Sequence, residues 1–398
     1  AAMEDGFAVP SAPAKCWSYH ANERMFLRLV GSAEEMERAQ AFHPEYAHVF
    51  YGDDERMEGY HEPALKVDFN AATFKALITF EKEEKKALVP CTPVVDNFVQ
   101  YLAKGSWTTN VDRFVEEVER DAASFRPIGE CVAEYQLDDR QEGGEQRSFA
   151  VYWSKFYDDD AGRYREDFLR WHEHIQAFVL MAIDGGTYIE ARDPRWEFYG
   201  LFERRRTAGG GERFRCVGYC TAYRFYSLKH SFRLRISQFL LLPPHQKRGH
   251  GRRLLSAIYD HAKARGVRDI PVEDPAPEFM RLRDMVDVKL LLEANAFSPD
   301  VLEITNEQID DIVKEHRLWK KQVRRCFEIF RLRHVRRSEA EEYRAYRLYV
   351  KRRLLHENRE HLEAFEPGEE RKRELHRLYT DLEAQYSALI EKLALQGL

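Results

Sequence analysis

The chain has 398 residues, enough for roughly two or three domains of ordinary size. A hydrophobic content of 44%, with 25 Phe and 20 Tyr, excludes a disordered chain. The 62 basic and 68 acidic residues give a formal net charge of −6, which argues against sequence-independent binding to the phosphates of nucleic acids and favours a basic partner.

Six cysteines are scattered without the spacing of a disulfide framework, so we expect a reducing intracellular compartment and no disulfides. Cys216 and Cys220 lie in a strand-like segment, and no second pair of ligands joins them, which argues against a metal site. Apolar runs fall short of the roughly 18–20 residues that a membrane helix needs, so no membrane association is expected.

In chain order, the predicted elements form three blocks. Residues 1–140 alternate strand-like runs, such as residues 25–30, with polar and acidic loops, which predicts a mixed α/β domain. Residues 141–295 contain aromatic strands, then a helix and a further strand, and the glycines at 209–211 predict a hairpin turn. Residues 296–398 change to a helical period and predict a helical domain.

Two capping patterns mark helix starts in the third block, Thr305 followed by Gln308 and Ser338 followed by Glu341. Apolar residues then fall on three helical stripes, which are most simply core or partner-facing surfaces. The stripes are Trp319, Val323, Cys326 and Phe330; Tyr343, Tyr346, Val350 and Leu354; and Leu375, Leu378, Leu382, Tyr386, Leu389 and Leu393. The arginine-rich residues 331–337 are typical of a solvated helix end, with contact to an acidic partner as the alternative.

The chemistry lies in the middle block, where an apolar strand at 236–242 is followed by a glycine turn at 246–251 and a helix. Gly249 and Gly251 let the backbone bend so that successive N–H groups and the positive helix end converge on an anion such as pyrophosphate. A glycine turn alone is a weak signal, but the Q-x-x-G-x-G pattern and the next strand at 267–272 strengthen it. Because the first glycine of G-x-G-x-x-G and the whole G-x-x-x-x-G-K pattern are missing, coenzyme A is favoured over a dinucleotide or a triphosphate.

The Q-x-x-G-x-G segment resembles the pyrophosphate motif of the GCN5-related N-acetyltransferase superfamily, and further segments resemble its type B histone acetyltransferase branch. These are His-Pro-Glu-Tyr at 43–46, Tyr-Gly-Asp-Asp-Glu at 51–55, Asp-Pro-Arg-Trp at 193–196, Val-Gly-Tyr at 217–219, Arg-Ile-Ser-Gln at 235–238, Gly-His-Gly at 249–251, Glu-Asp-Pro at 273–275 and Leu-Arg-Asp at 282–284. The resemblance implies an α+β fold. Its mixed N-acetyltransferase sheet would carry an amino-terminal α/β domain and a carboxy-terminal helical domain.

The resemblance also implies that acetyl-coenzyme A lies in a cleft between the strand ending near Leu242 and the strand ending near Val272, with no metal. It assigns the thioester and the pantetheine arm to the backbone of Phe239, Leu240 and Leu241. It assigns the pyrophosphate to Gln246, Lys247, Arg248, Gly249, His250, Gly251 and Arg252. From the residues alone, the same strand also fits a plain core strand, and both interpretations can hold together.

Acetylation of a lysine needs a base, because free lysine has a pKa of about 10.4 and is protonated at neutral pH. Glu273 and Asp274 stand where the last strand ends and a helix begins, although helix capping is the alternative for Asp274. The resemblance assigns the role of principal general base to Glu273. It also places Asp184 where the family usually carries a glutamate that assists deprotonation, but the shorter side chain leaves that role open.

Recognition of a histone tail calls for acidic and aromatic surface. The resemblance implies that the groove for the amino-terminal tail of histone four is lined by Asp53, Asp54, Glu55, Trp196, Tyr223, Arg224 and Phe225. From the residues alone, the acidic trio also fits a solvated loop, and Tyr223 and Phe225, two apart on a strand, share one face that also fits a core.

The sequence therefore favours a histone acetyltransferase that acts on the lysine ε-amine in the tail of newly synthesised histone four. The alternatives are an N-acetyltransferase of the same superfamily for another protein or a small amine, and a non-catalytic histone-binding scaffold. The large flanking blocks argue against a small substrate, and the glycine turn and Glu273 argue against a scaffold. By resemblance, we expect a histone three–four dimer and a WD-repeat histone chaperone as partners, and a location in cytoplasm and nucleus.

Overall fold

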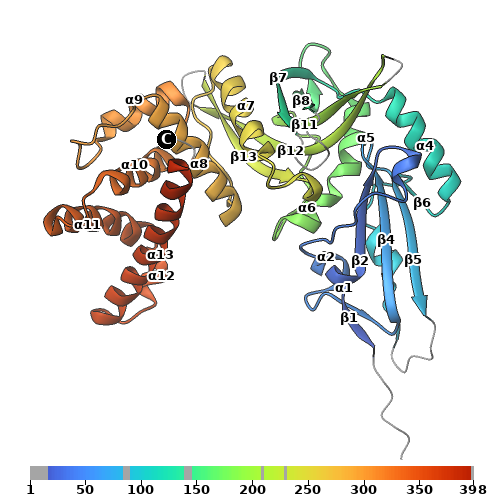
Figure 1. The fold of residues 1–398 in the computed structure, drawn as a ribbon, viewed down its shortest axis with the longest axis horizontal. Helices are drawn as coiled ribbons and strands as arrows, with labels where there is room; N and C mark the ends of the chain where they lie inside the picture. The colour runs from blue at the N-terminus through green and yellow to red at the C-terminus, as the bar shows by residue number, and fades with distance from the viewer. Residues whose placement is uncertain (1–16, 84–89, 139–145, 208–209, 228–230, 396–398) are drawn as a thin grey trace, which may run out of the picture. The chain divides into compact units, whose positions relative to one another are not determined.

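The computed structural model describes residues 17–83, 90–138, 146–207, 210–227 and 231–395 (Figure 1). The chain divides into two compact units. The first is Ala1–Tyr219 with Leu240–Gln246, and the second is Cys220–Phe239 with Lys247–Leu398. The three-domain division at residues 140 and 295 stays a prediction.

A four-stranded sheet with the order β2-β4-β5-β6 opens the first unit. Its strands are β2 (Met25–Val30), β4 (His61–Asn70), β5 (Ala76–Glu83) and β6 (Trp107–Thr108). Strand β2 confirms the prediction for residues 25–30, and it runs parallel to β4. Val30 of β2, Leu77 of β5, and Phe114 and Val118 of helix α4 (Val111–Ser124) form a buried cluster that packs this helix onto the sheet.

The other elements of this unit are short strands and helices around the sheet. They are β1 (Ser18–His20), β3 (Arg56–Glu58), β9 (Tyr157–Asp158), β10 (Arg163–Tyr164), α1 (Ala21–Arg24), α2 (His48–Tyr51), α3 (Val94–Val99), α4 (Val111–Ser124), α5 (Glu166–Ile175), α6 (Ala177–Ala182), and the 3₁₀ turns η1 (Ala33–Glu35) and η2 (Pro243–His245).

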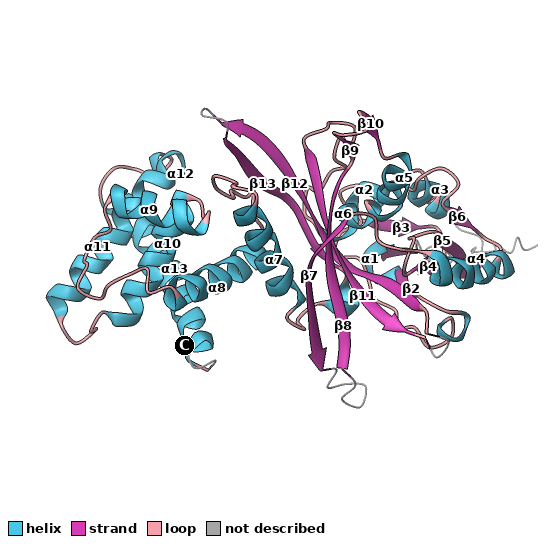
Figure 2. Ribbon diagram, turned by 90° about the horizontal axis from the view of Figure 1, so that it is seen from above, coloured by secondary structure: helices cyan, strands magenta, loops and turns pink. Residues whose placement is uncertain are grey.

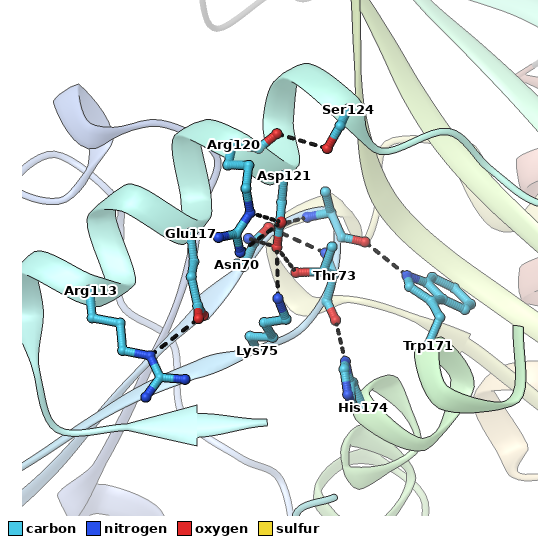
Figure 3. A network of polar contacts seen from close by, with 11 residues as sticks. Asn70, Thr73, Lys75, Arg113, Glu117, Arg120, Asp121, Ser124, Trp171 and His174 are labelled. Atoms are coloured by element: carbon cyan, nitrogen blue, oxygen red, sulfur yellow. Dashed lines mark hydrogen bonds and ion pairs between the residues drawn. The ribbon is translucent and has the colours of Figure 1, made fainter. Parts of the chain in front are cut away.

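Asp121 of α4 fixes the turn between β4 and β5 (Figure 3). Its Oδ2 accepts hydrogen bonds from Asn70 Nδ2 at 3.2 Å and Thr73 Oγ1 at 2.9 Å, and it lies 3.4 Å from Lys75 Nζ. Trp171 Nε1 of α5 donates to a carbonyl of the same turn at 2.9 Å. These contacts satisfy a buried carboxylate, which would otherwise be costly, and join two helices to one turn.

A second, five-stranded sheet has the order β13-β12-β11-β8-β7. Its strands are β7 (Glu130–Asp138), β8 (Gln146–Lys155), β11 (Trp196–Arg206), β12 (Glu212–Ser227) and β13 (Ser231–Leu241). The predicted hairpin between β11 and β12 is confirmed, because the Thr207 N–H donates to the Gly211 carbonyl across it at 2.8 Å, while Gly209 of the predicted turn lies outside the described residues. Gly210 has a φ of 79°, a conformation that glycine adopts without steric cost.

The described residues after 276 form helices and loops, apart from an isolated bridge between Leu318 and Ile270 (Figure 2). The helices of the second unit are α7 (His250–Ala264), α8 (Pro277–Glu293), α9 (Asn306–His316), α10 (Lys320–His334), α11 (Ala340–Glu357), α12 (Arg359–Glu363) and α13 (Glu369–Ala394). Helix α10 contacts α8, α9, α11 and α13, so it is the centre of this helical region. The predicted stripes supply its core, with Val323, Cys326, Val350, Tyr386 and Leu393 all buried.

One predicted cap is confirmed and one is wrong. Thr305 and Gln308 form a reciprocal capping box at the start of α9. Helix α11 instead begins after Glu339, whose side chain makes no capping hydrogen bond. The Glu339 N–H donates to the Arg336 carbonyl at 3.0 Å, and this turn carries the chain past Ser338 before the helix starts.

Candidate active site

Strand β13 has two different faces. Leu234, Ile236 and Leu240 are buried, whereas Arg235 and Ser237 between them are half-buried. This alternation follows from strand geometry, in which successive side chains point to opposite sides of the sheet. One face of β13 therefore belongs to the core, and the other carries polar side chains that remain accessible.

The segment at residues 268–273 runs parallel to β13, as the predicted strand at 267–272 requires, but it is not a regular strand. Ile236 and Val272 form an isolated parallel bridge. Pro271 has no N–H to donate, and the Ile270 N–H donates away from β13, to the Arg317 carbonyl at 2.9 Å. The predicted strand at 267–272 is therefore not formed as a regular strand, and its pairing with β13 is limited to an isolated bridge and the backbone hydrogen bonds beside it.

This register brings Glu273 to the accessible face of β13. The Glu273 N–H donates to the Ile236 carbonyl at 2.9 Å. Ile236 and Val272 are paired, and the side chains of their neighbours in sequence point to the opposite face. Glu273, next to Val272, therefore lies on the same face as Arg235 and Ser237, next to Ile236. The sequence analysis named these two β13 residues only within the Arg-Ile-Ser-Gln segment of the family resemblance and gave them no role, although the alternation of the strand would have placed them on one face.

Both carboxylate oxygens of Glu273 are engaged. Arg235 Nη2 lies 2.8 Å from Oε1, and Ser237 Oγ donates to Oε2 at 2.7 Å. The Glu273 side chain keeps 37% of its surface exposed. A carboxylate that is fixed from two sides and still accessible can accept a proton from an amine placed beside it.

Arg235 also connects Glu273 to an aromatic pair on β12. Its guanidinium carbon lies 4.7 Å from the centre of the Phe225 ring, and that ring lies 4.7 Å from the Tyr223 ring. The two aromatic residues thus share one strand face as predicted, and Phe225 is exposed, which disfavours the core interpretation for it. A cation between a carboxylate and an aromatic face is stabilised by both. The position between Glu273 and the Phe225 ring therefore favours a positively charged group.

The glycine turn leads directly into α7. Gly249 is the N-cap of this helix with a φ of 88°, and Lys247 before it has a φ of 61°. Gly251 lies buried within the first helical turn, so the predicted bend belongs to Gly249 alone. Burial, together with the nearby cation of Arg248, lowers the pKa of His250 to about 4. The positive charge at this helix end therefore comes from the backbone and from the side chains of Lys247, Arg248, Arg252 and Arg253 rather than from His250.

The remaining predicted cofactor residues of β13 and its loop belong to the first unit. Gln246 Nε2 donates to the Leu241 carbonyl at 3.0 Å, which closes the loop after the strand. A Cβ at Gly218 would lie 2.4 Å from the Leu240 carbonyl oxygen, so the backbones approach here as only glycine permits. The cofactor contacts of Leu240, Leu241 and Gln246 stay a prediction.

Among the predicted acidic residues, Glu55 has a clear local role. Its Oε1 accepts hydrogen bonds from the N–H groups of Ala47 at 2.5 Å and His48 at 2.8 Å, at the start of α2. Burial opposes ionisation, but these bonds and one from Asn22 outweigh it and hold the pKa of Glu55 below its usual value. Asp53 and Asp54 beside it are exposed and remain available to a ligand.

The other predicted residues lie in different surroundings. Asp184 is exposed in the turn after α6, and Trp196 is buried at the start of β11. Asp274 is exposed, and the predicted capping alternative is wrong for it, because α8 has Ala276 as its N-cap without a side-chain hydrogen bond. Arg224, which lies between Tyr223 and Phe225 in the sequence, is half-buried.

The described residues contain no group of three or more His, Cys, Asp or Glu side chains arranged to hold a metal ion. Among the helices in the described part of the chain, none combines the length and apolar character needed to cross a membrane.

Three family models match the chain. "Histone acetyl transferase HAT1 N-terminus" matches residues 17–184, "Acetyltransferase (GNAT) family" matches residues 147–279, and "Histone acetyltransferase type B catalytic subunit, C-terminal" matches residues 283–332.

Curated relatives agree with these matches. A histone acetyltransferase type B catalytic subunit of Dictyostelium discoideum is 32% identical over 80% of this chain, which spans 65% of that protein's length. The Homo sapiens protein of the same description is 30% identical over 84% of this chain and 79% of its own length. The chain belongs to the family of type B histone acetyltransferase catalytic subunits.

This acetyltransferase is thus an acyltransferase enzyme that acts on histones, with the mixed sheets and carboxy-terminal helical region of the predicted fold class. Enzymes of the GNAT family use acetyl-coenzyme A. Glu273, Arg235 and Ser237 fall inside the part of the chain that matches the GNAT model.

Proposed function

We propose that this acetyltransferase transfers the acetyl group of acetyl-coenzyme A directly to a lysine ε-amine in the amino-terminal tail of newly synthesised histone four. Glu273 is the general base of this proposal. The observation that carries it is the Glu273 carboxylate, fixed by Arg235 and Ser237 and separated from the exposed Phe225 ring by one cationic side chain.

In the proposed reaction, the substrate ammonium takes the place that the Arg235 guanidinium holds beside Glu273. Arg235 Nε is buried and has no hydrogen-bond partner among the described residues. Displacement of this side chain therefore breaks no hydrogen bond of Nε. Glu273 then accepts one proton from the ammonium, and the neutral amine attacks the thioester carbonyl. A C–N bond forms, the C–S bond breaks, and the electron pair leaves with the coenzyme A sulfur, which takes the second proton from the attacking nitrogen and departs as the thiol.

The residues of the glycine turn fit a pyrophosphate. Backbone N–H groups and the positive end of the helix dipole gather at the first turn of α7, Gly249 bends the backbone into that turn, and Lys247 and Arg248 are exposed beside it. We therefore propose that Lys247, Arg248, Gly249 and the first turn of α7 hold the phosphates. Phe239 lies on the Glu273 face of β13, and we assign its backbone to the acyl arm.

The direct test mixes the pure protein with labelled acetyl-coenzyme A, core histones and spermine in separate reactions. We expect label on histone four and none on spermine. Labelled spermine without labelled histone would favour a small-amine acetyltransferase, and no label anywhere would favour the non-catalytic scaffold.

Ser237→Ala is expected to lower kcat by about threefold to tenfold, because one hydrogen bond contributes roughly 0.5–1.5 kcal/mol. The Michaelis constants for acetyl-coenzyme A and for tail peptide should stay unchanged, since Ser237 orients the base without touching either substrate. Ser237→Thr keeps the hydroxyl and should restore turnover. Equal kcat values for Ser237→Ala and the wild type would remove Ser237 from the site.

Asp53→Asn combined with Asp54→Asn is expected to raise the Michaelis constant for tail peptide by about threefold to tenfold, because exposed carboxylates contribute about 0–1 kcal/mol each. High salt should reduce the difference in Michaelis constant between the variant and the wild type, and the Michaelis constant for acetyl-coenzyme A should stay unchanged. Glu55 is left intact because it holds the start of α2.

The matched control for this pair is Asp159→Asn with Asp160→Asn, which removes two exposed charges from another loop of the first unit. If the two double variants acetylate tail peptide equally well, Asp53 and Asp54 belong to a solvated loop. The same experiment on a histone three–four dimer, with and without a WD-repeat chaperone, tests the partners that the family resemblance suggests.

A further inference from the structure

A cavity of about 720 Å³ lies in the helical region of the second unit, lined by residues of α10 and α11 and by Glu303. Five lysine or arginine side chains and three glutamates line it, in a chain whose formal net charge is −6. The lining of the cavity therefore carries more basic than acidic side chains, although the protein as a whole is acidic. We call this cavity the basic cavity.

A buried ion pair forms one wall of the basic cavity. Arg353 donates from Nε and Nη2 to the two carboxylate oxygens of Glu328, both at 2.7 Å, and Tyr386 donates to Glu328 at 2.9 Å. Only 1% of Glu328 is exposed, and three hydrogen bonds satisfy it. A bidentate pair of this kind is rigid, so this wall is fixed before any ligand arrives.

Each acidic side chain of the lining forms an ion pair with an arginine. Glu303 pairs with Arg352, and Glu328 and Glu357 both pair with Arg353. Glu328 and Glu357 share one arginine, and Lys320 of the lining pairs with Asp310, so the positive charge that remains available lies on the other cations of the lining.

The basic side chains are not neutralised to the same extent. Lys321 lies 5.2 Å from the Trp319 ring centre, and Arg324 donates to the Asn306 amide oxygen at 2.7 Å. Within the described part of the chain, no carboxylate forms an ion pair with Lys321 or Arg324. Both side chains are exposed, so the cavity offers positive charge to a partner at its rim.

Exposed leucines stand beside this positive charge. Leu348 and Leu355 expose 52% and 46% of their surfaces, and they flank Arg352 at four and three positions along α11. Leu302, 59% exposed, precedes Glu303, the partner of Arg352. A free phosphate or a nucleic acid gains nothing from leucine side chains, whereas a protein segment can cover them and meet the cations together.

We propose that the basic cavity and the leucines Leu302, Leu348 and Leu355 dock an acidic, partly apolar segment of a partner protein. The histone substrate is itself basic, so its charge excludes it as the occupant. The surface thus serves a third protein, separate from both substrates, and its use does not depend on which tail lysine is acetylated.

The test uses the full chain and a fluorescent twelve-residue peptide that repeats Glu-Glu-Leu. Lys321→Glu with Arg324→Glu should weaken binding in fluorescence anisotropy by at least about tenfold, because reversal removes attraction and adds repulsion. Leu348→Ser with Leu355→Ser should also weaken it. The matched control is Lys314→Glu with Lys392→Glu, which makes the same change of net charge at exposed lysines outside the cavity and should bind like the wild type.

Histone acetylation should be unchanged in all these variants, which also shows that they fold. Equal peptide binding by the Lys321/Arg324 variant and the wild type would overturn the proposal. So would equal binding of a peptide in which serine replaces every leucine. Displacement of the peptide by inorganic pyrophosphate, an RNA oligonucleotide or phosphatidylserine vesicles at low concentration would instead assign the surface to phosphate groups and would also overturn it.

Discussion

Replacing Glu273 by glutamine is expected to slow acetyl transfer by about 10²–10⁴ while leaving the affinity for acetyl-coenzyme A nearly unchanged. The amide keeps the shape of the carboxylate and can still accept a hydrogen bond from Ser237, but it cannot take a proton from the substrate ammonium. Single-turnover kinetics with tail peptide at neutral pH measures the loss, and calorimetry measures cofactor binding.

Asp274→Asn is the natural companion variant, because Asp274 is adjacent, acidic and exposed, but within the described part of the chain it forms no hydrogen bond or ion pair with Arg235 or Ser237. We expect it to retain most of the activity. If Glu273→Gln turns over like the wild type, the base role passes to Asp274 or Asp184, and the proposed mechanism is wrong at its central residue.

Gly251→Asp is expected to abolish binding of acetyl-coenzyme A without unfolding the protein. Gly251 lies buried in the first turn of α7, where a carboxylate would obstruct the approach of a phosphate to the backbone and repel its charge. Calorimetry measures the loss of binding, and thermal unfolding shows whether the fold persists.

Ala264→Asp places the same side chain at the exposed carboxyl end of α7 and should bind acetyl-coenzyme A normally. Should Gly251→Asp prove unstable, Lys247→Gln with Arg248→Gln tests the turn at exposed positions and should weaken cofactor binding in a salt-dependent way. Normal affinity in a folded Gly251→Asp variant would exclude the turn as the phosphate site.

The sequence alone determined the features that depend on near neighbours. The strand at residues 25–30, the glycine hairpin and the capping box of Thr305 all follow from contacts within a few positions. The order of strand, glycine turn and helix around Gly249 is local in the same sense, and it supplied the coenzyme A prediction. Family resemblance contributed Glu273, which no periodicity would have distinguished from other glutamates.

Only the tertiary structure decided what surrounds Glu273. Ser237 is 36 positions away in sequence, and its contact with Glu273 depends on the register of Ile236 with Val272. Register is set by packing and by the proline in the segment, and a shift of one residue would turn Glu273 to the opposite face. The basic cavity has the same origin, because its charges come from separate helices whose side chains meet only when α10 and α11 pack together.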